Sequence, residues 1–154
     1  MKKYNNIKIN DATVEYSIKT KKHNDINNIQ ITSSNICYNY IKSLYDDNIN
    51  IYESCYIILL NQQKKTKGWV KISQGGITGT VVDIRLVAYF AVQSLSVGVI
   101  LVHNHPSGNL TFSKQDINLC KRLKEGLGIL DICLVDSIVL TDSGYISAAD
   151  RGII

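Results

Sequence analysis

Residues 97–108 read VGVILVHNHPSG, and this stretch is the most informative part of the chain for the fold. Its first half, 97–102, is short and apolar, which predicts a strand buried on both faces of a sheet. The strand runs directly into His103, and residues 105–112 are predicted to form a loop. The ends of buried strands are common places for sites in α/β sheets, so the polar residues that follow are candidates for function.

The segments on both sides of this strand alternate between helical and strand patterns. Three segments have apolar residues at helical spacing: one begins at Ser33 or Ser34, one spans 83–96 with Leu95 on its apolar face, and one begins at Ser113. The apolar face of the last segment is Ile117, Cys120, Leu123 and Leu127. Four segments have strand patterns: 52–60, 68–73, 132–140 and 145–147. This order predicts an α/β (α+β) domain in which a mostly buried, mixed β-sheet is flanked by helices.

The length and composition fit one globular domain with an extension before it. The chain has 154 residues, of which 45% are hydrophobic, and this is enough to bury a core without disulfides. We expect residues 36–154 to form the domain and residues 1–35 to form an N-terminal extension. In the extension, Val14, Tyr16 and Ile18 alternate with polar residues, which indicates either an added edge strand or an interface.

The net charge and the cysteines give little information about binding partners. The net charge of +4 and the lysine excess before residue 36 could favour nucleic acid, but a solvated surface explains them as well. The four cysteines lack C-x-x-C spacing, no secretory signal precedes them, and no apolar run is long enough to span a membrane. We therefore expect a cytoplasmic protein that does not enter a membrane.

His103 and His105 are two of the three histidines in the chain. In an extended backbone residues i and i+2 point to the same side, so both imidazoles could bind one metal ion, although H-x-H alone is a weak signal. Asp116 could be a third ligand, because the turn at 106–108 could bring the next helix back over the histidines. Ser113 and Asp116 equally resemble a capping box, with Asp in place of the usual Glu or Gln. The local pattern leaves both alternatives open.

Glu53 is the glutamate best placed to accept a proton from a metal-activated water. It begins an otherwise apolar strand, where an unpaired buried carboxylate would be costly. Glu15 is expected to point outward on an edge strand, and Glu125 lies late in its helix beside charged residues. The simpler alternative for Glu53 is a carboxylate at a strand end that reaches water.

Other zinc patterns do not fit the chain. The deaminase motifs H-x-E and P-C-x-x-C, the zincin motif H-E-x-x-H and the cysteine spacing of zinc fingers are all absent. What remains is an H-x-H pair with a downstream Asp.

The run HNHPSG at 103–108, with Ser113 and Asp116 beyond it, resembles the RadC family of JAB/MPN-type (JAMM) metalloprotease domains. The signature of that family is an upstream Glu, then H-x-H-P, a spacer and S-x-x-D, and the likeness covers roughly residues 53–149. It implies a JAB/MPN domain of cytidine-deaminase-like architecture. It also implies one Zn²⁺ per chain bound by His103, His105 and Asp116, with Glu53 as general acid/base and Ser113 hydrogen-bonded to the tetrahedral intermediate.

The same resemblance implies a zinc metallopeptidase that hydrolyses a peptide or isopeptide bond in a protein or peptide substrate. Two alternatives stay open: a DNA-repair-associated RadC-like factor, and a non-catalytic MPN-like interaction scaffold. The scaffold would be expected to have lost a ligand, whereas all are present here. The chain also departs from the family in two ways. No helix-hairpin-helix pattern precedes residue 50, and Ser137 follows Asp136 where members tend to have His.

Overall fold

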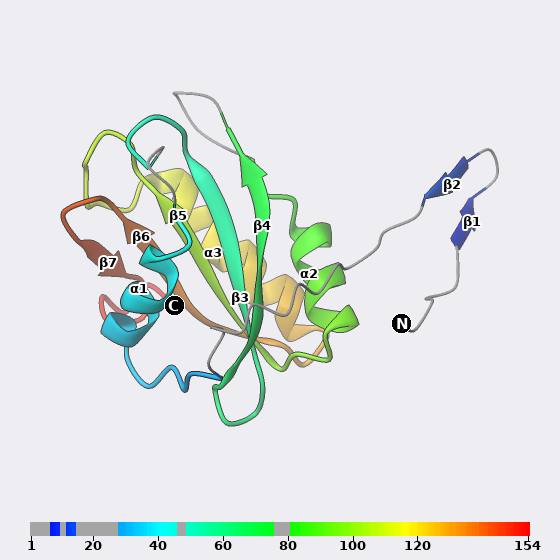
Figure 1. Ribbon diagram of the computed structural model, residues 1–154. Helices are drawn as coiled ribbons and strands as arrows, with labels where there is room; N and C mark the ends of the chain where they lie inside the picture. Colours follow the sequence, from blue (N-terminus) through cyan, green and yellow to red (C-terminus); the bar gives the residue numbers. More distant parts are fainter. Residues whose placement is uncertain (1–6, 10–11, 15–27, 46–48, 76–80) are drawn as a thin grey trace.

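A five-stranded mixed sheet forms the centre of the computed structural model, which describes residues 7–9, 12–14, 28–45, 49–75 and 81–154. The elements in chain order are β1 (Ile7–Ile9), β2 (Ala12–Val14), α1 (Ser34–Lys42), β3 (Ser54–Leu60), β4 (Thr66–Gln74), α2 (Ile84–Gln93), β5 (Gly98–Asn104), α3 (Lys114–Gly128), β6 (Cys133–Leu140) and β7 (Tyr145–Ser147) (Figure 1). The predicted α+β architecture, a mixed sheet flanked by helices, is confirmed.

The strand predicted from residues 97–102 lies in the middle of this sheet. The order of the strands is β4-β3-β5-β6-β7, and β5 pairs antiparallel with β3 and parallel with β6. The parallel pair is connected through α3, as a crossover between parallel strands requires. Because β5 has a neighbour on each side and helices over both faces, every one of its residues is buried.

Helices cover both faces of the sheet, so the core has two halves. Alternate residues of β3 point to opposite faces. Ile57 packs with Leu123 and Leu127 of α3, whereas Ile58 packs with Ile41 of α1 on the other face. Burying a side chain of this size stabilises the fold by about 1.5–3 kcal/mol. The two halves together fix β5 between α1 and α3 (Figure 1).

Several predicted boundaries are wrong, and two of the corrections concern the site. The strand predicted at 68–73 spans Thr66–Gln74. The strand predicted at 97–102 continues to Asn104, so His103 lies inside the sheet rather than after it. The strand predicted at 52–60 starts at Ser54, which places Glu53 just before it. The predicted helix over 83–96 ends at Gln93, where the hydroxyl of the C-cap residue Ser94 donates to the Phe90 carbonyl.

Ending α2 at Gln93 leaves Leu95 outside the helix face to which the periodicity assigned it. Leu95 is 81% exposed and has a φ of 51°. The periodicity continued past the cap because it registers apolar spacing and not hydrogen bonding.

The N-terminal part of the chain is described only in pieces. β1 and β2 pair antiparallel with each other, with Ile7 opposite Val14. Glu15, Tyr16 and Ile18 lie outside the described residues. Packing of the domain begins ahead of residue 36, because Ile31 is buried beneath α1.

Within the part of the chain that the structure describes, no helix has both the length and the apolar character needed to cross a membrane.

Candidate metal centre

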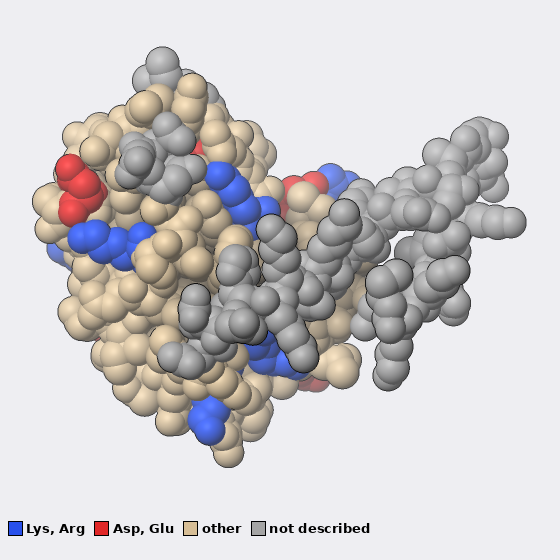
Figure 2. Space-filling model, viewed as in Figure 1, with Lys and Arg blue, Asp and Glu red and all other residues tan. Residues whose placement is uncertain are grey.

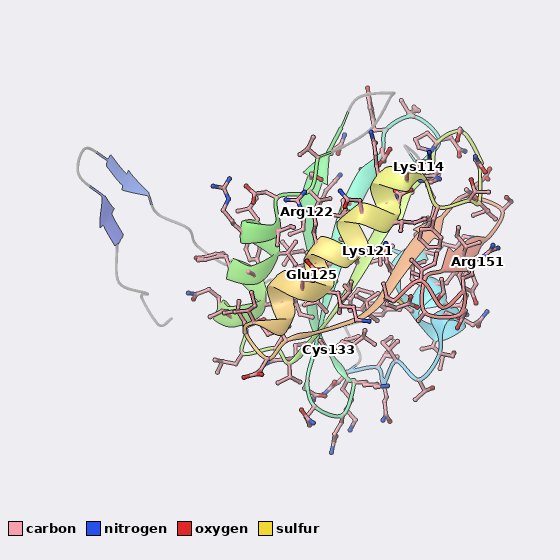
Figure 3. All side chains as sticks on the ribbon, turned by 180° about the vertical axis from the view of Figure 1, so that it is seen from behind. Lys114, Lys121, Arg122, Glu125, Cys133 and Arg151 are labelled. Carbon is pink, nitrogen blue, oxygen red and sulfur yellow. The ribbon has the colours of Figure 1, made fainter. Side chains whose placement is uncertain are left out.

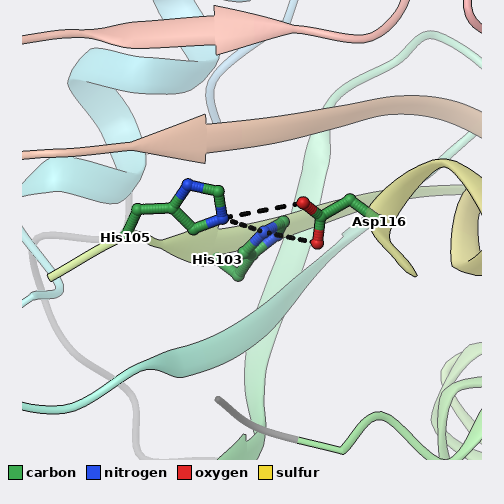
Figure 4. Close-up of side chains that lie close together, drawn as sticks. All are labelled: His103, His105 and Asp116. Atoms are coloured by element: carbon green, nitrogen blue, oxygen red, sulfur yellow. Dashed lines mark hydrogen bonds and ion pairs between the residues drawn. The ribbon is translucent and has the colours of Figure 1, made fainter. Parts of the chain in front are cut away.

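His103 and His105 converge because β5 stays extended to its end. His103 pairs with Cys55 of β3 and shares the face that α3 covers. The His103 side chain is only 4% exposed, and the His105 side chain is 15% exposed. Their Nε2 atoms lie 3.1 Å apart (Figure 4). The Nε2 atoms of the two imidazoles therefore come together, as the i, i+2 spacing predicted.

Asp116 completes the cluster from the first turn of α3. Its Oδ1 lies 3.1 Å from His103 Nε2, and its Oδ2 lies 3.7 Å from His105 Nε2. The capping box is also present: the Ser113 amide donates to Asp116 Oδ2 at 2.7 Å, and the Asp116 amide donates to Ser113 Oγ at 3.1 Å. The two alternatives for Asp116 are thus compatible, because the capping bond fixes the carboxylate that faces the histidines.

A tight turn returns the chain from β5 to α3. The Gly108 amide donates to the His105 carbonyl at 3.0 Å, and Gly108 has a φ of 76°, which a residue with a Cβ adopts at a cost. His105 Nδ1 lies 2.8 Å from the Asn109 carbonyl. A carbonyl only accepts, so Nδ1 carries the proton, and in the neutral ring Nε2 keeps its lone pair for the cluster.

The donor atoms suit a tetrahedral metal ion. Two imidazole nitrogens and one carboxylate oxygen form a common zinc set, and ligands at 2.0–2.1 Å from a tetrahedral ion lie about 3.3 Å from one another. The 3.1 Å between the two Nε2 atoms and the 3.1 Å from His103 Nε2 to Asp116 Oδ1 are close to that value, and the other carboxylate oxygen, Oδ2, lies 3.7 Å from His105 Nε2. Among the described residues, this is the one group of three or more His, Cys, Asp or Glu side chains whose donor atoms all lie within 4.8 Å of one another.

The ionisation of Asp116 also favours a cation. Burial by itself raises the pKa of this carboxyl, but the hydrogen bond and charge of His103 and the two hydrogen bonds with Ser113 outweigh burial. The net effect holds the pKa of Asp116 below its usual range. The carboxylate is therefore negative at neutral pH, as a metal ligand must be.

A pocket of about 690 Å³ opens beside the cluster, and all five residues singled out in the sequence line it: Glu53, His103, His105, Ser113 and Asp116. Glu53 is half-buried, and no described residue hydrogen-bonds or ion-pairs with its carboxylate. The three metal-ligand candidates thus form one cluster, and the two catalytic candidates share its pocket.

Asn104 is a structural part of this site that the sequence reasoning missed. Its side chain is fully buried and points away from the histidines, toward the segment before β3. Its Nδ2 donates to the carbonyls of Ile49 and Tyr52 at 2.6 and 2.8 Å, and its Oδ1 accepts from the Ser54 amide at 2.7 Å. Asn104 therefore holds the backbone on both sides of Glu53.

Ser137, where the chain departs from the family, lies away from the pocket. It is fully buried in β6 and opposite Leu101 of β5, and it does not belong to the pocket lining. The neighbouring Asp136 is also buried, and it accepts hydrogen bonds from the Ser137 amide, the Ser147 hydroxyl and the Ala149 amide.

Comparisons with known proteins show the family of the chain. A family model described as a RadC-like JAB domain matches residues 31–153. The chain belongs to this family. A protein of Flavobacterium johnsoniae named UPF0758 protein is 38% identical over 102 residues, which is 66% of this chain and 44% of that protein. A UPF0758 protein of Porphyromonas gingivalis is 37% identical over 125 residues, which is 80% of this chain and 54% of that protein. The RadC-like chain thus spans about half the length of these relatives.

Proposed function

We propose that this RadC-like JAB domain is a zinc-dependent metallopeptidase that hydrolyses a peptide or isopeptide bond. The observation that supports the proposal best is the convergence of His103, His105 and Asp116 in one pocket with the carboxylate of Glu53, with which no described residue hydrogen-bonds or ion-pairs. Two imidazoles and an anionic carboxylate suit a divalent cation, and a nearby carboxylate suits proton transfer.

Each residue has a defined part in the proposed hydrolysis. His103, His105 and Asp116 would hold the ion, and when bound, zinc lowers the pKa of water and polarises a carbonyl group. Glu53 would take a proton from the attacking water and pass it to the leaving nitrogen. The Ser113 oxygen accepts from the Asp116 amide, so its O–H remains able to donate to the carbonyl oxygen as that atom gains negative charge.

The metal is tested first, by elemental analysis of purified protein reconstituted with zinc near neutral pH. We expect about one zinc per chain. His103→Ala and Asp116→Asn should lose it, whereas Asp131→Asn, an exposed Asp after α3, should keep it. Wild-type protein that stays free of zinc would contradict the proposal and favour the scaffold alternative.

The reaction is tested with a library of peptides whose cleavage products are identified by mass spectrometry. We expect Glu53→Gln to retain zinc and to lose about 10²–10⁴ of the hydrolytic rate. The control is Glu125→Gln, which removes an exposed glutamate of α3 outside the pocket and should leave the hydrolytic rate unchanged. Full activity in Glu53→Gln would remove Glu53 from the mechanism.

The DNA-associated alternative has less support from the described residues. Lys and Arg side chains are scattered over the face seen in Figure 2 rather than gathered into a basic stripe. A protein or peptide substrate therefore remains the proposed partner. The cytoplasmic location expected from the sequence likewise remains a prediction, which the four free cysteines fit.

A further inference from the structure

The pocket is larger than the metal cluster, and it continues along α3. Gln115, Asn118, Leu119 and Arg122 all line it, and they occupy positions i, i+3, i+4 and i+7 of the helix. Residues at this spacing lie on one side of a helix. Gly126, one turn further on, lies against Ile84 at the start of α2, so this side of α3 faces α2. A volume of about 690 Å³ suits part of a peptide better than an ion alone.

Arg122 gives the far part of this pocket its charge. Among the lining residues that the structure describes, Arg122 is the one Lys or Arg, and the two acidic residues, Glu53 and Asp116, belong to the proposed reaction centre. The Arg122 side chain is exposed, and no described carboxylate forms an ion pair with it. Figure 3 shows Arg122 on the side of α3 toward α2, while Lys121, its neighbour in sequence, is not part of the lining.

The distance along α3 between the metal cluster and Arg122 sets how many substrate residues could lie between them. From Asp116 to Arg122 the helix rises by about 9 Å. An extended peptide advances by about 3.3 Å per residue. A peptide with its scissile bond at the cluster would therefore bring a group roughly two to four residues away within reach of the Arg122 guanidinium.

We propose that Arg122 determines specificity by binding a carboxylate of the substrate two to four residues from the scissile bond, and this rests on the proposed peptidase function. The carboxylate belongs either to an Asp or Glu side chain or to the C-terminus of the substrate. A planar guanidinium can hold a carboxylate through two parallel hydrogen bonds, which a lysine ammonium does not reproduce. The proposed substrate is thus a peptide that has either an Asp or Glu side chain or its own C-terminus close to the cleaved bond.

The experiment uses zinc-loaded protein and synthetic eight-residue peptide pools. One pair of pools differs only in a C-terminal acid or amide, and a second, amidated pair contains either Asp and Glu or Asn and Gln. The first pair reports a C-terminal carboxylate, and the second reports an acidic side chain. We expect the wild type to prefer one carboxylate pool, and Arg122→Gln to lose roughly 10- to 100-fold in kcat/KM on it, mostly through KM.

Three further variants sharpen the result. Arg122→Lys should recover only part of the preference, and Lys121→Gln should behave as the wild type. Arg122→Glu should favour peptides with Lys at the position where the wild type favours Asp or Glu. An equal loss on carboxylate and amide peptides would contradict the inference, because it would indicate general damage to the pocket.

Binding separates this inference from the proposed function. Fluorescence anisotropy measures the affinity of labelled peptides for Glu53→Gln protein with and without Arg122→Gln. If no peptide is hydrolysed by the wild type but the carboxylate peptides bind at least about 10-fold more weakly without Arg122, the peptidase proposal is wrong. Arg122 then binds a carboxylate in the pocket but does not determine the specificity of a cleavage. If peptides are hydrolysed with the same preference in Arg122→Gln, the inference is wrong and the peptidase proposal stands. If carboxylate peptides neither bind nor react selectively, the inference is overturned.

Discussion

Asn104 lies between His103 and His105 in the sequence, but its side chain lies on the opposite face of β5. Its three hydrogen bonds hold the backbone of residues 49–54, which carries Glu53. A buried side-chain amide with all these partners restricts the backbone beside Glu53 more than loop packing alone would. We infer that Asn104 is a positioning residue, which would act on the proposed reaction through Glu53.

Replacing Asn104 by Ala should uncouple Glu53 from the metal cluster. The Ser54 amide and the Ile49 and Tyr52 carbonyls lose their partner, which costs about 1–3 kcal/mol of stability for each buried group that stays unpaired. We expect kcat to fall while KM and zinc content change little, and Asn104→Asp, which keeps only the acceptor, to be intermediate. Cys37→Ala, a core variant in α1, is the control for destabilisation. If Cys37→Ala is destabilised to the same extent as Asn104→Ala and loses as much kcat, the positioning role of Asn104 is refuted.

At the scale of elements, the start of α3 combines a helix cap with a pocket wall. Ser113 is the N-cap, whose side-chain oxygen accepts from the Asp116 amide, and it also lines the pocket. The N-cap role of Ser113 and its proposed role as a hydrogen-bond donor can be tested separately, because one substitution can remove the donor and leave the helix cap almost unchanged.

Ser113→Gly should lose only a few tenths of a kcal/mol, because Gly is tolerated at the N-cap. It should nevertheless lose about 10²-fold or more in kcat if the hydroxyl stabilises the developing oxyanion. Ser113→Thr keeps both the cap and the hydroxyl, and we expect it to retain most of the activity. Urea unfolding and steady-state kinetics measure the two effects, and an active Ser113→Gly variant would leave Ser113 with the cap alone.

The junction of β6 and β7 depends on one buried carboxylate. Burial, together with the nearby charge of Asp150, raises the pKa of Asp136 in spite of its three hydrogen bonds. The folded protein therefore binds this proton more tightly than the unfolded chain. The stability that follows is present at acid pH and is lost as the pH rises through the pKa of the folded state.

The free energy of unfolding of the wild type should consequently exceed that of Asp136→Ala by more at about pH 4.5 than at about pH 8. Urea titrations of both proteins at the two pH values measure the difference. A gap that widens toward alkaline pH would mean that the hydrogen bonds from Ser137, Ser147 and Ala149 dominate over burial.

At the scale of the whole molecule, the reactivity of the cysteine thiols shows whether reagents can reach the core. Burial raises the pKa of Cys37 to about 12 and also raises those of Cys55 and Cys120, whereas Cys133 is exposed. A thiol that stays protonated and inaccessible reacts slowly. We expect a thiol reagent at neutral pH to label Cys133 rapidly and the other three only in denaturant, as mass spectrometry of the intact protein would show. Fast labelling of Cys37 would indicate that the α1 side of the core opens.

The sequence predicted those parts of the molecule that depend on local periodicity. Alternation in an extended strand predicted that His103 and His105 converge. Helical spacing predicted an apolar face of Ile117, Cys120, Leu123 and Leu127, of which the last three are buried and Ile117 is half-buried. Alternation also implies that Asn104 points into the opposite face. Its partners could not be predicted, because they are backbone atoms brought near by strand pairing over some fifty residues of chain. The pocket along α3 could not be predicted either, since Glu53, Val81 and α3 lie far apart in the sequence and meet only in the fold.

All three metal-ligand candidates lie in one uninterrupted segment that runs from His103 to Asp116. Its middle, around Ser107 and Asn109, is exposed. An ion held at both ends would close this segment into a ring, as a covalent cross-link does, and would reduce the freedom of the chain between them. The loop should then resist a protease for longer when zinc is present, so its cleavage half-life would report occupancy of the site without any knowledge of the substrate.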